Sequence, residues 1–311
     1  MVSLMNSLKP LYQSRLVQLK AALGTWHGRF VVAGLTLGLV YFPTWLTQLF
    51  SRSLMQGSTA LSIILIMAAL GGYLLWSQRS QLAQLPVLEV DQVIGYMLIV
   101  VSLVLFPFCR FAVWPQAILW LLTLVGIAFS TWGGQFFIRH PLPPLLLAAT
   151  VYPQPGALAR TLWETFTPDQ FLERLMAYTG SEALQLIGQP AISEGAYIAI
   201  PPHGAVHVDW GCNGFTMAVQ MAIAGFLMGI FLKQNWFKTT LMVVTGAILA
   251  LIFNIPRIML LTLAAVYWGE GWFEFWHGTW GGQIFIGILF TLYYYVIMAM
   301  VNRRPRKTTN S

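Results

Sequence analysis

The sequence predicts an all-α protein, a polytopic bundle of about eight transmembrane helices with one ordered loop outside the membrane. Hydrophobic residues make up 57% of the 311 residues and charged residues only 9%, whereas soluble domains carry about 25% charged residues. Apolar runs of the length that crosses a bilayer recur along the whole chain. The net charge is +7, and the basic residues lie mainly in short connections and at the two ends. This is typical of membrane topology signals and not of a nucleic-acid-binding surface.

The first predicted span follows a polar and basic N-terminal segment, residues 1–29. Its apolar run, residues 30–50, is longer than the core of about 7–15 residues in a secretory signal and lacks a small-residue cleavage site. We therefore expect it to be retained. The other predicted spans are the apolar runs 58–76, 92–109, 113–131, 141–153, 213–232, 239–267 and 280–301.

Two of these runs are atypical. The run 141–153 is short and begins among three prolines, so we expect it to be tilted, broken or only partly inserted. The run 239–267 is long and contains Pro256, which removes a backbone donor and favours a kink or a break.

Lysine and arginine predict the orientation. The tail 302–311 is strongly basic and the segment 1–29 is basic too, which places both termini in the cytoplasm. The one long connection, residues 154–211, then lies outside. Its first half, from Pro168 to Leu186, has helical spacing, and its second half, from Ala196 to Asp209, alternates like a strand. We expect an ordered loop within a single integral membrane domain that covers residues 1–311.

The two cysteines, Cys109 and Cys212, are too few for a disulfide framework. Cys109 ends an apolar run and is interpreted as a buried, inert thiol. Cys212 lies in Asp209-Trp210-Gly211-Cys212-Asn213-Gly214, where the outer loop meets the sixth predicted span. A helix that began near Asn213 would place its positive end beside the thiol and favour the thiolate. A structural cysteine is the alternative for this residue taken alone.

Two more polar features lie at membrane depth. Arg257 follows Asn254 by three residues inside the seventh predicted span, on the same helix face. A buried arginine costs about 2.5–3.5 kcal/mol in a span, so a functional role is the default hypothesis. Counted at 1.5 Å per residue from Lys238, Arg257 lies roughly 28 Å up, near the outer surface, where snorkelling is the alternative. His277 precedes the last span on the same side, where a residue of the interfacial aromatic belt is the alternative.

Cys212, Arg257 and His277 therefore converge at one depth and on one side, from three separate helices. A cysteine nucleophile needs a base or a cation that lowers its pKa, and its tetrahedral intermediate needs a hydrogen-bond donor. The three side chains could fill these roles.

The same residues carry a resemblance. The chain resembles the exosortase/archaeosortase family of polytopic membrane transpeptidases, and within it the cyanobacterial type. The family pattern is Cys-x-Gly at the outer end of one span, Asn-x-x-Arg in the next, and His or Arg before the last. Cys212-Asn213-Gly214, Asn254-Ile255-Pro256-Arg257 and His277 match it in order and spacing. The resemblance covers about residues 141–301. Asn213 departs from it, because many members have Ser there.

The resemblance implies a reaction and a substrate class. The substrates would be membrane proteins with a C-terminal sorting signal, made of a short PEP-CTERM-like motif, a transmembrane helix and a basic tail. Cys212 would form a thioester with the shortened protein, Arg257 would stabilise the oxyanion or orient the thiolate, and His277 would move protons. Asn254 would position Arg257, with Asn213 and Gly214 supporting the cysteine. An unknown acceptor nucleophile or water would resolve the thioester. The site would face outward from a bacterial plasma membrane, and neither a cofactor nor nucleic acid is expected.

Other functions predict different patterns. His203 and His207, followed by Cys212, have a spacing seen in zinc sites, but the neighbouring prolines and Gly204 disfavour the helix that this spacing needs. No metal site is therefore expected. A transporter or channel would carry a polar path across the whole membrane, whereas the polar residues here gather near one face. A subunit for exopolysaccharide export would tolerate loss of the Cys212 thiol.

Overall fold

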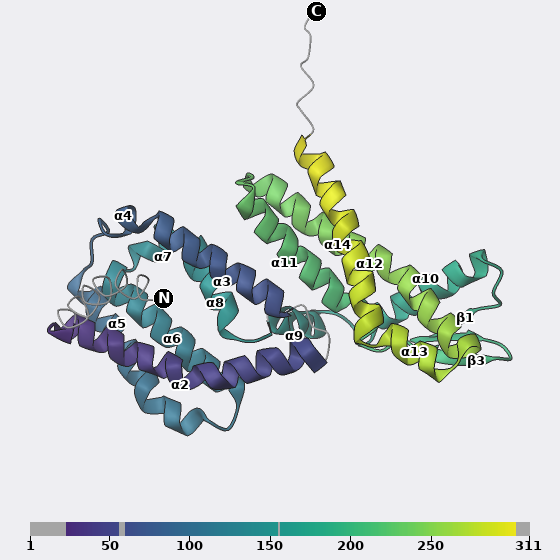
Figure 1. Ribbon diagram of the computed structural model, residues 1–311, viewed down its shortest axis with the longest axis horizontal. Coiled ribbons are helices and arrows are strands. Elements are labelled where there is room, and N and C mark those ends of the chain that lie inside the picture. The colour runs from purple at the N-terminus through teal and green to yellow at the C-terminus, as the bar shows by residue number, and fades with distance from the viewer. Residues whose placement is uncertain (1–22, 56–59, 155, 303–311) are drawn as a thin grey trace, which may run out of the picture. The chain divides into compact units, whose positions relative to one another are not determined.

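The computed structural model describes residues 23–55, 60–154 and 156–302, and most of them are helical (Figure 1). The chain divides into two compact units. The first comprises the residues up to 50 together with 64–155, and the second comprises 51–63 and the residues from 156 onward. Most of the predicted basic segment 1–29 and nearly all of the basic tail 302–311 lie outside the described residues.

The described residues of the first unit form helices and no strands. The helices lying wholly or mostly in it are α2 (Trp26–Met55), α3 (Ala60–Ser77), α4 (Arg79–Leu82), α5 (Glu89–Leu105), η1 (Phe106–Cys109), α6 (Val113–Trp132), α7 (Gln135–Arg139) and α8 (Leu142–Val151). Helices α5 and α6 cross at two glycines: a Cβ on Gly95 would lie 2.5 Å from the Gly126 carbonyl oxygen. The Tyr41 hydroxyl donates to the Val151 carbonyl at 2.9 Å and so joins α2 to the end of α8.

The second unit begins with two helices and a small sheet. These elements are α9 (Ala157–Phe166), α10 (Phe171–Leu186), β1 (Ile192–Glu194), β2 (Tyr197–Ile200) and β3 (Gly204–His207). The three antiparallel strands have the order β1-β2-β3. The side chains of Ile198 and Ile200 point from one face of the sheet into a core that also contains Leu184 of α10. The other face carries Tyr197 and His207, whose rings lie 4.7 Å apart.

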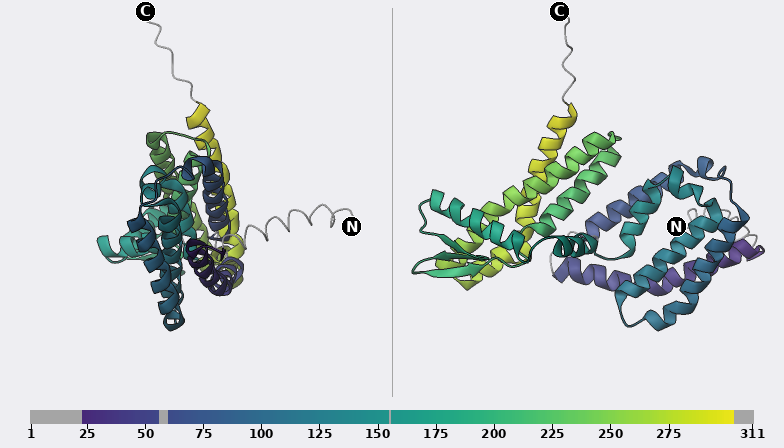
Figure 2. Two further views of the ribbon diagram at one scale, coloured as in Figure 1. Left: turned by 90° about the vertical axis from the view of Figure 1, so that its left-hand side faces the viewer. Right: turned by 180° about the vertical axis from the view of Figure 1, so that it is seen from behind.

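Four helices and one π-helical turn complete this unit. They are α11 (Phe215–Phe231), α12 (Trp236–Leu263), η2 (Ala264–Trp268), α13 (Glu270–His277) and α14 (Thr279–Asn302). Helices α11, α12 and α14 lie side by side (Figure 2). The Tyr293 hydroxyl of α14 donates to the Met242 carbonyl of α12 at 3.0 Å. Of the kink or break expected at Pro256, the break does not occur, because α12 continues through this residue. The helical geometry changes later, at η2.

The structure supports a multi-pass helical membrane protein. Among the described residues, five helices are long and apolar enough to cross a membrane, namely Trp26–Ser51, Glu89–Cys109, Val113–Trp132, Trp236–Trp268 and Thr279–Asn302. Shorter apolar helices occupy the other three predicted spans, Leu61–Ser77, Leu142–Val151 and Phe215–Phe231. The number of eight spans therefore stays a prediction. The fold is also mostly, and not purely, helical, because β1–β3 form a sheet.

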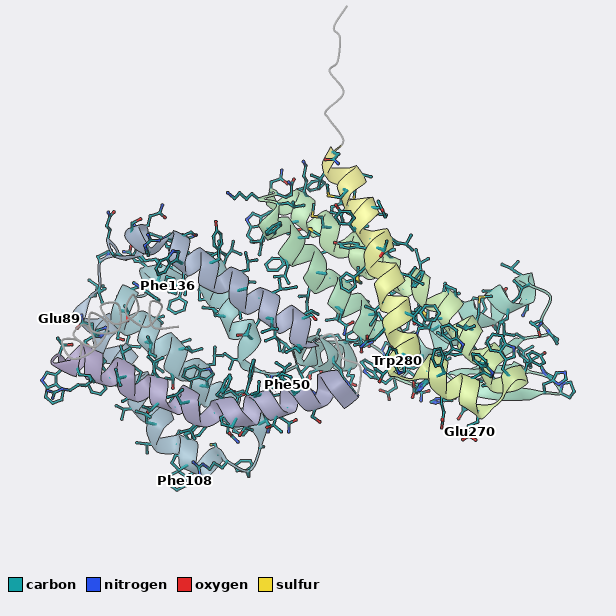
Figure 3. The ribbon with its side chains drawn as sticks, viewed as in Figure 1. Phe50, Glu89, Phe108, Phe136, Glu270 and Trp280 are labelled. Carbon is teal, nitrogen blue, oxygen red and sulfur yellow. The ribbon has the colours of Figure 1, made fainter. Side chains whose placement is uncertain are left out.

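Large apolar side chains point away from the protein over much of this structure. Phe108 is 75% exposed and Trp280 is 72% exposed, whereas Phe136 is buried (Figure 3). An aqueous solvent would disfavour so many exposed large apolar groups. The pattern fits a protein whose solvent is the hydrocarbon of a membrane.

Candidate active site

Cys212 sits in the short connection between β3 and α11. Its N–H lies 3.0 Å from the backbone oxygen of Asp209 and 3.0 Å from the Oδ1 atom of the same residue. The backbone oxygen and the Oδ1 atom of Asp209 thus close the turn together. The turn directs the thiol inward, and Cys212 is only 7% exposed.

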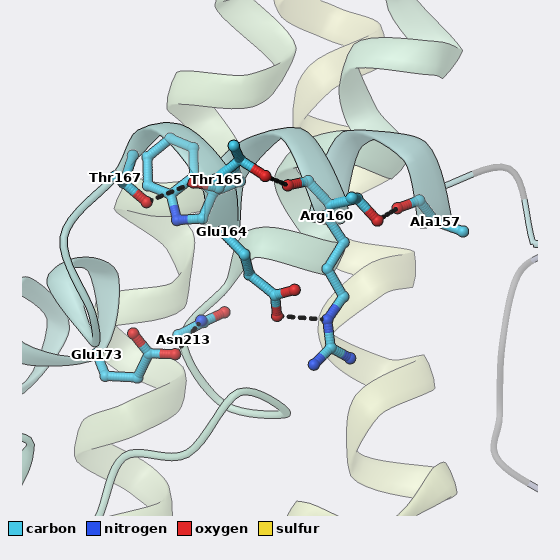
Figure 4. A network of polar contacts seen from close by, with 9 residues as sticks. Ala157, Arg160, Glu164, Thr165, Thr167, Glu173 and Asn213 are labelled. Atoms are coloured by element: carbon cyan, nitrogen blue, oxygen red, sulfur yellow. Dashed lines mark hydrogen bonds and ion pairs between the residues drawn. The ribbon is translucent and has the colours of Figure 1, made fainter.

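Glu173 holds Asn213, the residue after Cys212, in place (Figure 4). The Asn213 side chain donates to Glu173 Oε1 at 2.9 Å and accepts the Phe215 N–H at 2.9 Å. The second bond satisfies one of the free N–H groups at the start of α11. Both Asn213 and Glu173 are buried, so the turn is tied to α10 as well as to α11.

Asn254 and Gly214 fix the other side of the turn. Asn254 of α12 donates from Nδ2 to the Cys212 carbonyl at 2.8 Å. Gly214 has a φ of +80° and precedes the first residue of α11. A Cβ at this position would lie 2.8 Å from Asn254 Nδ2. Glycine is therefore needed both for its backbone conformation and for the close approach of Asn254.

His277 ends α13 and approaches the same turn. Three atoms lie within 4.8 Å of one another: a carboxylate oxygen of Asp209, the sulfur of Cys212 and a ring nitrogen of His277. His277 and Asp209 are exposed, while Cys212 is buried. The His277 ring stacks on Phe273, with centroids 5.2 Å apart. The structure thus brings a thiol, an imidazole and a carboxylate together, and the carboxylate of Asp209 contacts both the N–H and the thiol of Cys212.

Arg257 supplies the positive charge of the site. It is 7% exposed, so it does not snorkel out of the protein, and its Nε atom has no hydrogen-bond partner among the described residues. Its charge acts on the Cys212 thiol and lowers the pKa of that group. Buried polar groups are nearly always paired, so the unpaired Nε atom is a candidate contact for a bound ligand.

Trp276 adds a second unpaired donor. Its Nε1 atom is buried and lacks a partner within the described residues. The ring packs against the core that contains Cys212 and Ile258. Trp276 precedes His277, so α13 brings both an imidazole and a free indole N–H to the same side of the unit.

Burial and two charged residues act on the pKa of the Cys212 thiol. Helix α11 begins at Phe215, two residues later than expected. Burial raises the pKa of the Cys212 thiol to about 12, Arg257 lowers it, and the charge of Asp209 and a hydrogen bond to it raise it. Burial therefore opposes the thiolate that a helix start near Asn213 would favour.

The histidines considered for zinc lie elsewhere. The His203 ring contacts Tyr267 at 5.3 Å and the His207 ring contacts Tyr197 at 4.7 Å. Within the described part of the chain, only Asp209, Cys212 and His277 have a spacing that could hold a metal ion. Thiolate, imidazole and carboxylate are all zinc ligands.

Asp209 is the site residue that sequence reasoning missed. Its signal was its place three residues before Cys212, in the same motif. No role was assigned to it from the sequence. Only the turn that folds residue 212 back onto residue 209 shows that the carboxylate lies beside the thiol.

Fold and site together define a multi-pass membrane protein with a buried cysteine between a histidine, an aspartate and an arginine. The chain matches the family model of transmembrane exosortases (Exosortase_EpsH) over residues 45–294, and it belongs to that family. The match extends to the predicted spans before residue 141, which hydropathy alone had identified. No curated protein and no solved structure matches the chain.

Proposed function

We propose that this exosortase is a cysteine transpeptidase that cleaves C-terminal sorting signals from other membrane proteins. Its substrates carry a short PEP-CTERM-like motif, a transmembrane helix and a basic tail, and cleavage occurs at the outer face of a bacterial plasma membrane. The observation that carries the proposal is the spacing of Cys212, His277 and Asp209, whose reactive atoms lie within 4.8 Å of one another. The buried charge of Arg257 acts on the same thiol.

The first half of the reaction forms a thioester. His277 takes the proton of the Cys212 thiol while the sulfur attacks the scissile carbonyl. Because the pKa of the free thiol is about 12, proton removal accompanies the attack and does not precede it. Arg257 stabilises the oxyanion of the tetrahedral intermediate. The C–N bond then breaks, and His277 gives its proton to the departing amine of the transmembrane signal.

The second half transfers the shortened protein. An acceptor with an amine or hydroxyl group attacks the thioester and gives its proton to His277. His277 passes this proton to the sulfur as the C–S bond breaks, so the thiol re-forms. Water in place of the acceptor gives hydrolysis. Asp209 orients the His277 imidazole and stabilises its protonated form, as the third member of a triad does.

Cleavage of a tagged reporter in cells tests this function. The reporter carries a C-terminal sorting signal, and wild type is compared at equal membrane abundance with Cys212→Ala and with the matched control Cys109→Ala. The proposal expects shortening of the reporter by wild type and by Cys109→Ala, and none by Cys212→Ala. Equal shortening by Cys212→Ala would exclude Cys212 as nucleophile. A wild-type enzyme that leaves such reporters intact would favour a transport or export function.

A further inference from the structure

Strand β3 forms an open edge of the sheet. The strand order β1-β2-β3 leaves β3 paired on one side only. Ala205 and His207 of this strand are exposed. The opposite edge of the sheet is β1, whose central residue is Ser193.

The hydrogen-bond pattern shows which backbone groups of β3 are free. The Val208 N–H donates to the Ala196 carbonyl at 2.8 Å, in the same register that pairs Val206 with Ile198. In an antiparallel pair, hydrogen-bonded positions alternate with positions that point away from the partner strand. Val206 therefore faces β2, while Ala205 and His207 point their N–H and C=O groups outward. These four groups make no hydrogen bond within the residues that the structure describes.

Such an edge is complementary to one kind of ligand. Free N–H and C=O groups that recur every second residue match the backbone of another extended chain. Peptide-binding domains use this match, and the main-chain bonds supply affinity whatever the side chains are. The sheet behind the edge is firmly held, because Ile198 and Ile200 are fully buried in the core.

The position of this edge indicates which chain would bind. Strand β3 runs directly into the turn that holds Cys212, five residues after His207. Five extended residues span at most about 17 Å, and the turn from Asp209 to Cys212 shortens that distance. A peptide lying along β3 therefore comes within a few residues of the thiol.

We propose that the outer edge of β3 binds the substrate segment next to the scissile bond as an added strand. This proposal rests on the proposed function and names the recognition step of the same site. The backbone of Ala205 and His207 fixes the register of the segment. Alternate side chains of the segment lie on the sheet face that carries Tyr197 and His207, where they are selected.

Proline substitution tests the backbone contact. Ala205→Pro removes an N–H that points outward and leaves the bonds between β2 and β3 intact. Ser193→Pro is the matched control: its partner Ile198 directs its backbone groups to β3, so the Ser193 N–H also points outward, on the other edge. We expect Ala205→Pro to lower kcat/KM for the reporter roughly two- to tenfold through KM, as the loss of one hydrogen bond predicts. Ser193→Pro should match wild type. Equal kinetics of the two variants would overturn the proposal.

Disulfide capture gives a readout that needs no catalysis. Ala205→Cys in a Cys109→Ala, Cys212→Ala background is combined with reporters that carry single cysteines along the segment before the transmembrane helix. We expect disulfides at every second reporter position. Capture without this periodicity, or crosslinked enzyme dimers in place of enzyme–reporter pairs, would overturn the proposal. If wild type does not cleave the reporter, both the function and the edge proposal fail. If it cleaves but Ala205→Pro changes nothing, only the edge proposal fails.

Discussion

The chemistry of Cys212 depends on two residues with opposite effects. Arg257 favours the thiolate, while Asp209 favours the thiol through its charge and through a hydrogen bond. Burial outweighs Arg257, so the free enzyme holds a protonated sulfur. A neutral thiol resists oxidation and off-target alkylation. In the proposed mechanism it becomes a nucleophile only when a substrate and His277 are in place.

Substituting Asp209 by Asn should move reactivity and catalysis in opposite directions. Asn keeps an oxygen that can accept the Cys212 N–H but loses the negative charge, so the thiol pKa should fall and alkylation by iodoacetamide at pH 8 should become faster. Reporter cleavage should nevertheless drop at least about tenfold, because His277 loses the group that orients it. Both rates are measured in a Cys109→Ala background, where Cys212 is the remaining thiol. Unchanged cleavage would exclude a catalytic role for Asp209 and leave it only the structural role of closing the turn before Cys212.

The alkylation rate of Cys212 should rise with pH without levelling off below pH 10. The thiolate is the reactive form, and with a pKa of about 12 its fraction grows about tenfold per pH unit over this range. Arg257→Gln should slow alkylation at every pH, because the residue that lowers the thiol pKa is gone. A plateau near pH 8 in the wild-type protein would show that the thiol pKa is close to its ordinary value.

At the scale of elements, glycines set how closely the helices of the second unit approach. A Cβ on Gly225 of α11 would lie 2.5 Å from the Tyr293 hydroxyl and 2.8 Å from the Met242 carbonyl oxygen. A Cβ on Gly246 of α12 would lie 2.7 Å from the Met221 carbonyl oxygen. Small residues at such crossings are the usual means by which membrane helices pack tightly.

Gly225→Ala should therefore destabilise the protein, while Gly287→Ala on α14 should not. The added methyl group at residue 225 meets backbone atoms that cannot move aside, at a cost of about 1–3 kcal/mol. No atom lies within 4 Å of the corresponding position at Gly287. The aggregation temperature of the detergent-solubilised protein measures the difference. Equal temperatures for the two variants would mean that the crossing of α11 and α12 is looser than described.

Local signals in the sequence predicted the helices and strands well, but they predicted the contacts between these elements poorly. Hydropathy is a property of each segment alone, so the apolar runs coincide with helices; even the short run 141–153 corresponds to α8. Pro256 was expected to kink or break its helix, and α12 continues through it without a break. The alternation after Ala196 indicated strand, but neither the order β1-β2-β3 nor the free edge follows from it. These depend on turns whose geometry the sequence does not specify.

The candidate site shows the same division. Spacing and family pattern brought Cys212, Arg257, His277, Asn254, Asn213 and Gly214 to attention. The contribution of Asp209 required the turn that places its carboxylate at the Cys212 N–H. Likewise, the raised pKa of the thiol results from burial by residues distant in sequence, such as Ile258, which no motif records.

At the scale of the whole molecule, membrane orientation decides where substrate and acceptor meet the site. The basic ends predict cytoplasmic termini, and this places the segment 154–211, Cys212 and His277 on the outer side. Substrates would then be cleaved after their bulk has crossed the membrane. The basic tail of their sorting signals would remain in the cytoplasm.

Cysteine labelling in intact cells tests this orientation. In a Cys109→Ala, Cys212→Ala background, Glu194→Cys lies in the sheet and Gln84→Cys lies between the second and third predicted spans; both positions are exposed. A membrane-impermeant maleimide should label the first in intact cells and the second only after permeabilisation. The reverse pattern would place the site in the cytoplasm.

The most direct test of the central claim is capture of the thioester on Cys212. Membranes with wild type and reporter are quenched in acid, and the peptide containing Cys212 is analysed by mass spectrometry with and without hydroxylamine. The proposed mechanism predicts a reporter fragment on Cys212 that hydroxylamine releases and that is absent from Cys212→Ala. A reporter that is cleaved by wild type while Cys212 stays unmodified at all times sampled, or an adduct on another residue, would contradict it.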